Sequence, residues 1–251
     1  LTFIFGRLYT ANAVGNFSQA FKWDTMASTM ISGTTSQVAQ PVLAEVKLET
    51  ERQVTVFRKM LRFTAFLAFP AMFGLSMVAH EFIIVLISDK WADSIPLLRI
   101  LCISGAFLPF YTLYQNLMIS RGKSDVYLWI TTSLIAVQLL LVLLCYTKGM
   151  IFMVSAYTVE TVLWLFVWKV FAYREISIRL YDVLRDIIPY MFISAVIIIA
   201  VYFATSGIQN LIVLLLTRII LAIAAYFITM KLLGFKILDE CVNYLFHKNN
   251  L

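Results

Sequence analysis

The sequence predicts an all-α membrane protein, built as an antiparallel bundle of transmembrane helices. Of its 251 residues, 61% are hydrophobic and only 14% are charged. No soluble domain requires that much apolar surface, and apolar runs of about 20 residues are typical of helices that cross a bilayer. These runs are continuous and do not alternate with polar residues, which excludes a membrane β-barrel.

Eight hydrophobic segments divide the chain, and the short linkers between them predict antiparallel neighbours. The first segment, residues 1–17, starts at once without a signal peptide, so we expect a truncated helix and a C-terminal piece of a longer protein. The bundle should occupy residues 1–233 and a tail residues 234–251, within which 239–247 could form an interfacial helix. The other segments are expected at residues 25–44, 63–87, 96–119, 126–146, 151–168, 188–204 and 211–233.

Basic residues are unevenly distributed between the linkers. If successive linkers lie on alternate sides of the membrane, one side holds only Lys22, Lys90 and Lys148. The positive-inside rule then predicts that the other side, and the C-terminus with it, is cytoplasmic. That side carries Lys47, Arg52, Arg58, Lys59, Arg62, Arg121, Lys123, Lys169, Arg174, Arg179, Arg185, Lys231, Lys236 and Lys248.

The segment at residues 25–44 is unusually polar for a membrane helix. It carries no charge, and its hydroxyl and amide side chains recur every three or four residues, which places them on one helical face. Such a face suits a water-filled cavity. The alternative is a helix packed by small residues whose hydroxyls bond across an interface. The residues of this polar stripe are Thr25, Ser28, Ser32, Ser36 and Gln40.

Three arginines lie inside hydrophobic segments, where a charge costs roughly 2.5–3.5 kcal/mol on insertion scales. Arg7 is in the first segment, Arg99 near one end of the fourth, and Arg218 two turns into the eighth. A guanidinium binds phosphate through paired hydrogen bonds, so each could contact an anionic substrate. The alternative is that the long side chain reaches out of the bilayer to the interface.

Glu160 lies near the middle of the sixth segment and could be a proton or sodium site. It could equally be an internal structural partner of Thr158 and Thr161, or of an arginine such as Arg218. At one end of the fourth segment, Arg121 and Asp125 could pair to hold a gate or a loop. The alternative for that pair is a solvated cap.

Nothing in the sequence predicts an enzyme. It contains no GxSxG, HExxH or Walker A motif and no large catalytic loop. The three cysteines are far apart and the two histidines have no metal-like spacing, so we expect no metal site and no cofactor. The formal charge of +6 follows the predicted topology, so nucleic acid is not an expected partner.

Five short patches lie in order along the first half of the chain. They are GRLYTANAVGNFSQA at residues 6–20, VAQPVL at 38–43, PAMFGL at 70–75, LISDKW at 86–91 and NLMISRGKSD at 116–125. Together they resemble bacterial polysaccharide flippases of the Wzx type, which belong to the MOP superfamily with MATE exporters and lipid II flippases. Ser88, Ser120 and Lys123 depart from the family pattern, and the resemblance is strongest to colanic-acid and teichuronic-acid exporters.

The resemblance implies the second, C-terminal lobe of a two-lobed transporter in the bacterial inner membrane. Such a protein moves undecaprenyl-diphosphate-linked oligosaccharide repeat units across the membrane by alternating access. Its partners would be that lipid-linked oligosaccharide, membrane lipids and possible assembly partners such as a polysaccharide polymerase and a chain-length regulator. Arg7 and Arg218 would then contact the diphosphate, and the polar stripe would form the hydrophilic wall. The alternatives are a MATE-type drug or cation antiporter and an inactive half-transporter or membrane scaffold.

Overall fold

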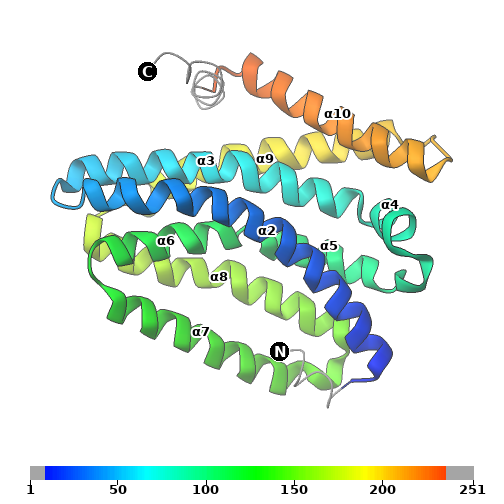
Figure 1. Cartoon of the computed structure of the whole chain (residues 1–251), viewed down its shortest axis with the longest axis horizontal. Helices are drawn as coiled ribbons and strands as arrows, with labels where there is room; N and C mark the ends of the chain where they lie inside the picture. Colours follow the sequence, from blue (N-terminus) through cyan, green and yellow to red (C-terminus); the bar gives the residue numbers. More distant parts are fainter. Residues whose placement is uncertain (1–8, 236–251) are drawn as a thin grey trace.

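The computed structural model describes residues 9–235, which form an antiparallel bundle of long helices with no strand in that range (Figure 1). Six helical spans within the described range are long and apolar enough to cross a membrane. The predicted all-α membrane fold is therefore confirmed. The predicted interfacial helix at 239–247 lies outside the described residues.

The first described helix, α2, spans Ala11–Glu45. The elements that follow are α3 (Thr50–Met77), α4 (Ala79–Glu81), the π-helical η1 (Phe82–Ile87), the 3-10 turn η2 (Asp89–Trp91), α5 (Ser94–Gly105), α6 (Leu108–Ser120), α7 (Ser124–Cys145), the 3-10 turn η3 (Tyr146–Lys148), α8 (Met150–Ile176), α9 (Leu180–Ala204) and α10 (Leu211–Leu232).

Helix α2 corrects the predicted segment boundaries. It begins at the N-cap Thr10, whose hydroxyl accepts a hydrogen bond from the Ala13 amide at 3.3 Å, and continues for 35 residues. The predicted break between residues 17 and 25 is wrong, because that stretch contains neither proline nor glycine to interrupt a helix. Lys22 therefore lies within a helix and not in a linker.

Two other boundaries also differ from the expectation. Helix α3 begins at Thr50, about thirteen residues before the predicted segment, so the charged stretch at residues 50–62 is already helical. The predicted helix at residues 96–119 is instead two helices, α5 and α6, with a break at residues 106–107. Pro109 stands in the first turn of α6, where its missing amide hydrogen leaves no bond unmade.

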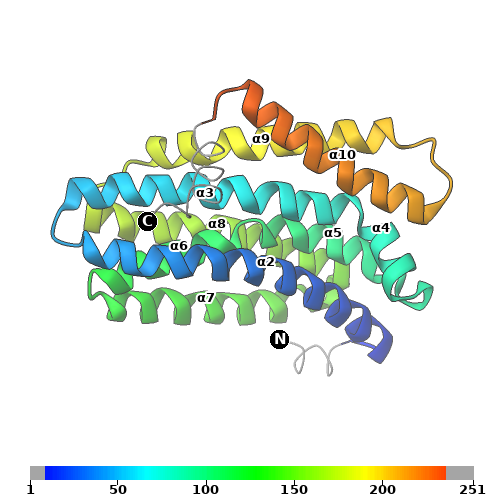
Figure 2. The same cartoon turned by 45° about the horizontal axis from the view of Figure 1, so that its top comes forward.

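The helices are layered according to how much of their surface other helices cover. In the α5–α6 span, 61% of the most apolar window is buried, whereas in the α7 span only 11% is. Helices α2, α3, α5 and α6 pack together, while α7 lies mainly against α8, and α10 against α9 (Figures 1 and 2). The bundle centre is filled by large side chains such as Trp168, Phe57 and Phe110. Apolar outer helices suit a protein that has lipid as its solvent.

The turns gather at two ends of the bundle. Turns 46–49, 121–123 and 177–179 lie together at one end, which we call the basic end because Lys47, Arg121 and Arg179 are there (Figure 1). Residues 78–93 and 205–210 lie at the opposite end, which we call the far end. Apart from the predicted linker before residue 25, which is helical, the linkers between residues 46 and 210 lie alternately at these two ends of the bundle.

Candidate functional site

Helix α2 presents a mixed polar face that no other described element covers. Its exposed side chains define what we call the open face. Gly33 lies within this face, and a Cβ atom added there would meet no side chain and no other described element within 4 Å. This helix is not among the six apolar spans of the described residues. A face of this composition fits contact with water or another protein surface better than contact with lipid alone. The open face consists of Met26, Thr29, Met30, Thr34, Gln37, Val38 and Gln40.

The predicted polar stripe lies on the flank of α2, rotated from the centre of the open face towards its own bundle. Ser28 is only 1% exposed, and its hydroxyl donates a hydrogen bond to the Thr25 carbonyl at 3.2 Å. Ser36 accepts a hydrogen bond from the Asn116 side-chain amide of α6 at 3.0 Å. For Ser28 and Ser36, this arrangement fits the packing alternative.

The other stripe residues are more accessible. Thr25 and Ser32 are half-buried, and the Ser32 hydroxyl donates to the Ser28 carbonyl at 2.9 Å. Gln40 is exposed and belongs to the open face. Hydroxyls that bond a carbonyl one turn back in their own helix need no water, so a polar residue in the sequence does not by itself mark a wet face.

Arg218 on α10 lies in a buried ion pair. Its side chain is 5% exposed, and Nη1 is 2.8 Å from Oε1 of Glu81, whose side chain is 4% exposed. Nε donates to the Thr205 hydroxyl at 3.1 Å, and the guanidinium lies 4.7 Å from the centre of the Tyr202 ring. Arg218 thus links α10 to α4 and to the end of α9, with a carboxylate of the chain beside it as counter-ion.

Glu160 on α8 does not meet Arg218, so that predicted pairing is wrong: each residue has a different partner on a different helix. The Gln138 side-chain amide of α7 donates to Glu160 Oε2 at 3.4 Å, while Oε1 is buried without a hydrogen-bond partner among the described residues. Glu160 lines a groove of about 670 Å³ between α7 and α8, together with Ser155 and Trp164. A buried carboxylate oxygen with a free lone pair could accept a proton or ligate a cation.

Sequence reasoning missed Asp24, because that position was expected in a linker. Asp24 lies inside α2, is 2% exposed, and its Oδ1 atom has no hydrogen-bond partner within residues 9–235. The carboxylate fits against α5 only because residue 105 is glycine. A Cβ built on Gly105 would stand 2.2 Å from Asp24 Oδ1 and 2.4 Å from the Met72 methyl.

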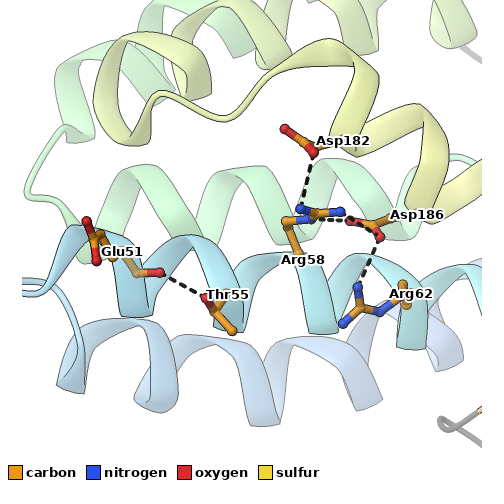
Figure 3. A network of polar contacts seen from close by, with 6 residues as sticks. All are labelled: Glu51, Thr55, Arg58, Arg62, Asp182 and Asp186. Carbon is orange, nitrogen blue, oxygen red and sulfur yellow. Dashed lines mark hydrogen bonds and ion pairs between the residues drawn. The ribbon is translucent and has the colours of Figure 1, made fainter.

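A second cluster that the sequence did not reveal joins α3 to α9 near the basic end (Figure 3). Arg58 contacts Asp186 through Nε at 2.7 Å and Nη2 at 3.3 Å, and contacts Asp182 at 3.2 Å. Arg62 adds a third bond to Asp186 at 3.0 Å. The Asp186 side chain is 5% exposed, so one buried carboxylate holds two arginines of the neighbouring helix. We call this group the arginine clamp.

Arg121 and Asp125 do not pair, which corrects the predicted contact. Arg121 donates to the backbone carbonyls of Lys47, at 3.0 Å, and of Glu175. These carbonyls follow α2 and end α8, where unsatisfied acceptors attract a cation. Asp125 is exposed in the first turn of α7, where a carboxylate is favourable at a helix N-terminus. Arg121 therefore ties three segments together at the basic end.

The remaining predicted arginines have different settings. Arg7 lies outside the described residues. Arg99 is exposed on α5 and makes no ion pair within the part of the chain that the structure describes. No group of three or more His, Cys, Asp or Glu side chains that could hold a metal ion occurs in residues 9–235.

The chain is similar to proteins whose names refer to polysaccharide biosynthesis. Residues 1–96 match the family described as polysaccharide biosynthesis protein. A Klebsiella pneumoniae protein described as an uncharacterized membrane protein in the cps region is 28% identical over 122 residues. The lipopolysaccharide biosynthesis protein WzxC of Escherichia coli is 24% identical over 125 residues, and the teichuronic acid biosynthesis protein TuaB of Bacillus subtilis 27% over 122. Each match covers about half of this chain and 25% of the relative.

The fold has a solved counterpart. The lipid II flippase MurJ, in an inward closed conformation, superposes with a TM-score of 0.73 at 14% sequence identity. The superposition covers 90% of this chain and 48% of MurJ, so the chain spans about half of that transporter. The predicted resemblance to bacterial proteins of polysaccharide synthesis is therefore confirmed over about half of the chain, and 90% of the chain shares the fold of the lipid II flippase MurJ.

Proposed function

We propose that the chain is the C-terminal lobe of a flippase that moves lipid-linked oligosaccharide across the bacterial inner membrane. The substrate would be an undecaprenyl-diphosphate-linked repeat unit, carried by alternating access between this lobe and another. The names of the relatives and the half-length match to MurJ support this proposal. The C-terminus would face the cytoplasm, and a polysaccharide polymerase and a chain-length regulator would be possible partners.

The observation that carries the proposal is the open face of α2. Gln37 and Gln40 are exposed on a helix that packs against α3, α5 and α6 on its other side. Thr34 is exposed too, and because its hydroxyl donates to the Met30 carbonyl at 3.0 Å, it offers a ligand only its acceptor lone pairs. Amides and hydroxyls hydrogen-bond sugar hydroxyls, whereas lipid offers them no partner. Thr25 and Ser32 would form the margin of this wall, with Ser28 and Ser36 supporting it from within the bundle.

The charged residues take separate roles in this proposal. Arg7 remains the proposed diphosphate contact, and Glu160 the proposed ion-coupling residue. Arg218 is left out of the substrate site because its guanidinium already has Glu81 as a counter-ion. Arg121 would stabilise the basic end through backbone carbonyls, without Asp125.

Transport in cells tests the open face. In a strain that lacks the natural gene, the full-length protein should restore surface polysaccharide, whereas Gln37→Leu and Thr34→Val should reduce export at normal protein levels. The matched control is Thr132→Val, which removes the hydroxyl of an exposed residue on the outer helix α7. Unchanged export in both open-face variants would exclude this face as the substrate wall. Unchanged export without the gene, together with loss of dye efflux, would exclude the flippase function.

A further inference from the structure

A groove at the far end of the bundle combines a polar rim with an apolar floor. It has a volume of about 330 Å³ and lies between α3, α5 and α9. Arg99 and Ser76 contribute the polar groups, and Tyr202 stands beside them. The floor is formed by Phe73, Ala195 and Ile198. The groove is separate from the open face of α2, which contributes no residue to its lining.

The depth of these residues matches the layers of a bilayer leaflet. Arg99 is five residues from the start of α5 and Tyr202 two residues from the end of α9, so both lie within about 8 Å of the far end at 1.5 Å per residue. Ala195 is nine residues from the end of α9, or roughly 13 Å from the far end and about 10 Å deeper than Tyr202. Cations and aromatic rings are common at the headgroup level, and apolar side chains below it. The polarity of the groove therefore changes along its length as that of a phospholipid does.

The cation at the rim is available to a ligand. Arg99 is exposed, and no carboxylate pairs with it anywhere in residues 9–235. The Ser76 hydroxyl donates a hydrogen bond to the Arg99 backbone carbonyl at 3.3 Å. This bond does not involve the Arg99 guanidinium group, which stays available to a ligand. Ile199 and Phe203, at the margin of the groove, are exposed on the outer surface of α9. The groove thus opens towards the lipid-facing side of this helix.

We propose that this groove binds one membrane glycerophospholipid, with its phosphate on Arg99 and one acyl chain along Phe73, Ala195 and Ile198. A guanidinium offers a phosphate two parallel hydrogen bonds. The groove lining contains a single cation, which suits one phosphodiester better than the greater charge of a diphosphate. The occupant would be a lipid of the leaflet at the far end. The bound lipid would cover the contact between α3 and α9. Tyr202, which lines the groove, also contacts the guanidinium group of the buried Arg218.

Native mass spectrometry of the full-length protein in detergent tests the site. The probe is palmitoyl-oleoyl-phosphatidylglycerol, compared with a diacylglycerol that has the same two chains and no phosphate. Arg99→Gln should weaken binding of the phospholipid roughly tenfold, the size expected for one charged hydrogen-bonded contact, and Arg99→Lys should weaken it less. Ala195→Phe should weaken both lipids, because it fills the floor. Arg185→Gln, which changes an exposed arginine at the other end of α9, should change neither affinity.

Three results would overturn the proposal. The first is unchanged phospholipid affinity in Arg99→Gln, and the second is equal affinity for the diacylglycerol and the phospholipid. The third is displacement of the phospholipid by undecaprenyl diphosphate at equal concentration, which would assign the groove to the transported lipid. Because lipid binding is measured without transport, failure here would leave the proposed flippase function untouched.

Discussion

The buried pair of Arg218 and Glu81 makes a quantitative prediction about stability. Replacing Arg218 with glutamine removes a charged hydrogen bond of 2.8 Å and leaves Glu81, only 4% exposed, without its counter-ion. A hydrogen bond to a charged group is worth about 1.5–3 kcal/mol, and stacking of the guanidinium on Tyr202 adds about 0.5–1 kcal/mol. Breaking a buried pair by removing one partner typically costs 3–5 kcal/mol, so we expect a loss of about 3–4 kcal/mol.

A double-mutant cycle isolates the pair itself. Glu81→Gln should destabilise the protein to a similar degree, because it leaves the guanidinium buried and uncompensated. The double variant Glu81→Gln/Arg218→Gln contains two neutral amides, so it should recover a coupling energy of about 2 kcal/mol relative to the sum of the single losses. The measurement is equilibrium unfolding of the full-length protein in lipid bicelles with added SDS. Additive losses, or an Arg218→Gln variant as stable as the parent, would refute the ion-pair interpretation.

The same cycle separates structure from transport. If Arg218 acts only through Glu81, the double variant should recover export together with stability. If the guanidinium contacts the diphosphate, the double variant should be stable and still fail to export.

Three further predictions concern the other contacts. Asp186→Asn should lower the free energy of unfolding by about 2 kcal/mol, because it weakens three charged hydrogen bonds to partly exposed arginines. Asp182→Asn should lower it by less than about 1 kcal/mol, because Asp182 is partly exposed and contacts Arg58 through one ion pair. Equal losses in the two variants would contradict the arginine clamp. Gly105→Ala should lower the midpoint of thermal unfolding, because the added methyl group would meet the Asp24 carboxylate. Adding Asp24→Ala to that variant should restore part of the lost midpoint. An unchanged midpoint in Gly105→Ala would show that α2 and α5 are not in contact there. Arg121→Gln should speed proteolysis at turn 46–49 without a large change in global stability, and unchanged cleavage would argue against its carbonyl contacts.

The fold was largely predictable from the sequence, because apolar runs of bilayer length report membrane helices directly. The residues at which helices begin and end were harder to predict from the sequence. The break expected before Thr25 would place Lys22 and Asp24 in a linker, yet the structure buries Asp24 inside one continuous helix. A charge signals a linker only when it faces water, and the sequence does not report which way it faces.

The candidate site was predicted in part. Periodicity placed Thr25, Ser32 and Gln40 on one side of α2, but it fixes only the angles between residues and not the direction in which the whole face points. The partner of Arg218 and the arginine clamp could not be predicted, since Glu81 is 137 residues from Arg218, and Asp186 is 128 residues from Arg58. Contacts at such separations depend on how the helices pack.

The weak apolar character of α2 has a consequence for biogenesis. The helices that follow α3 are apolar enough to leave the translocon and partition into lipid one at a time. Helix α2, with its hydroxyls, its amides and the buried Asp24, would gain little by doing so alone. Its insertion should therefore depend on helices synthesised after it, above all α5, which packs against Asp24, and α6, whose Asn116 donates to Ser36 of the polar stripe. If synthesis stops before α5, we expect α2 either to stay at the translocon or to leave the membrane for the aqueous phase.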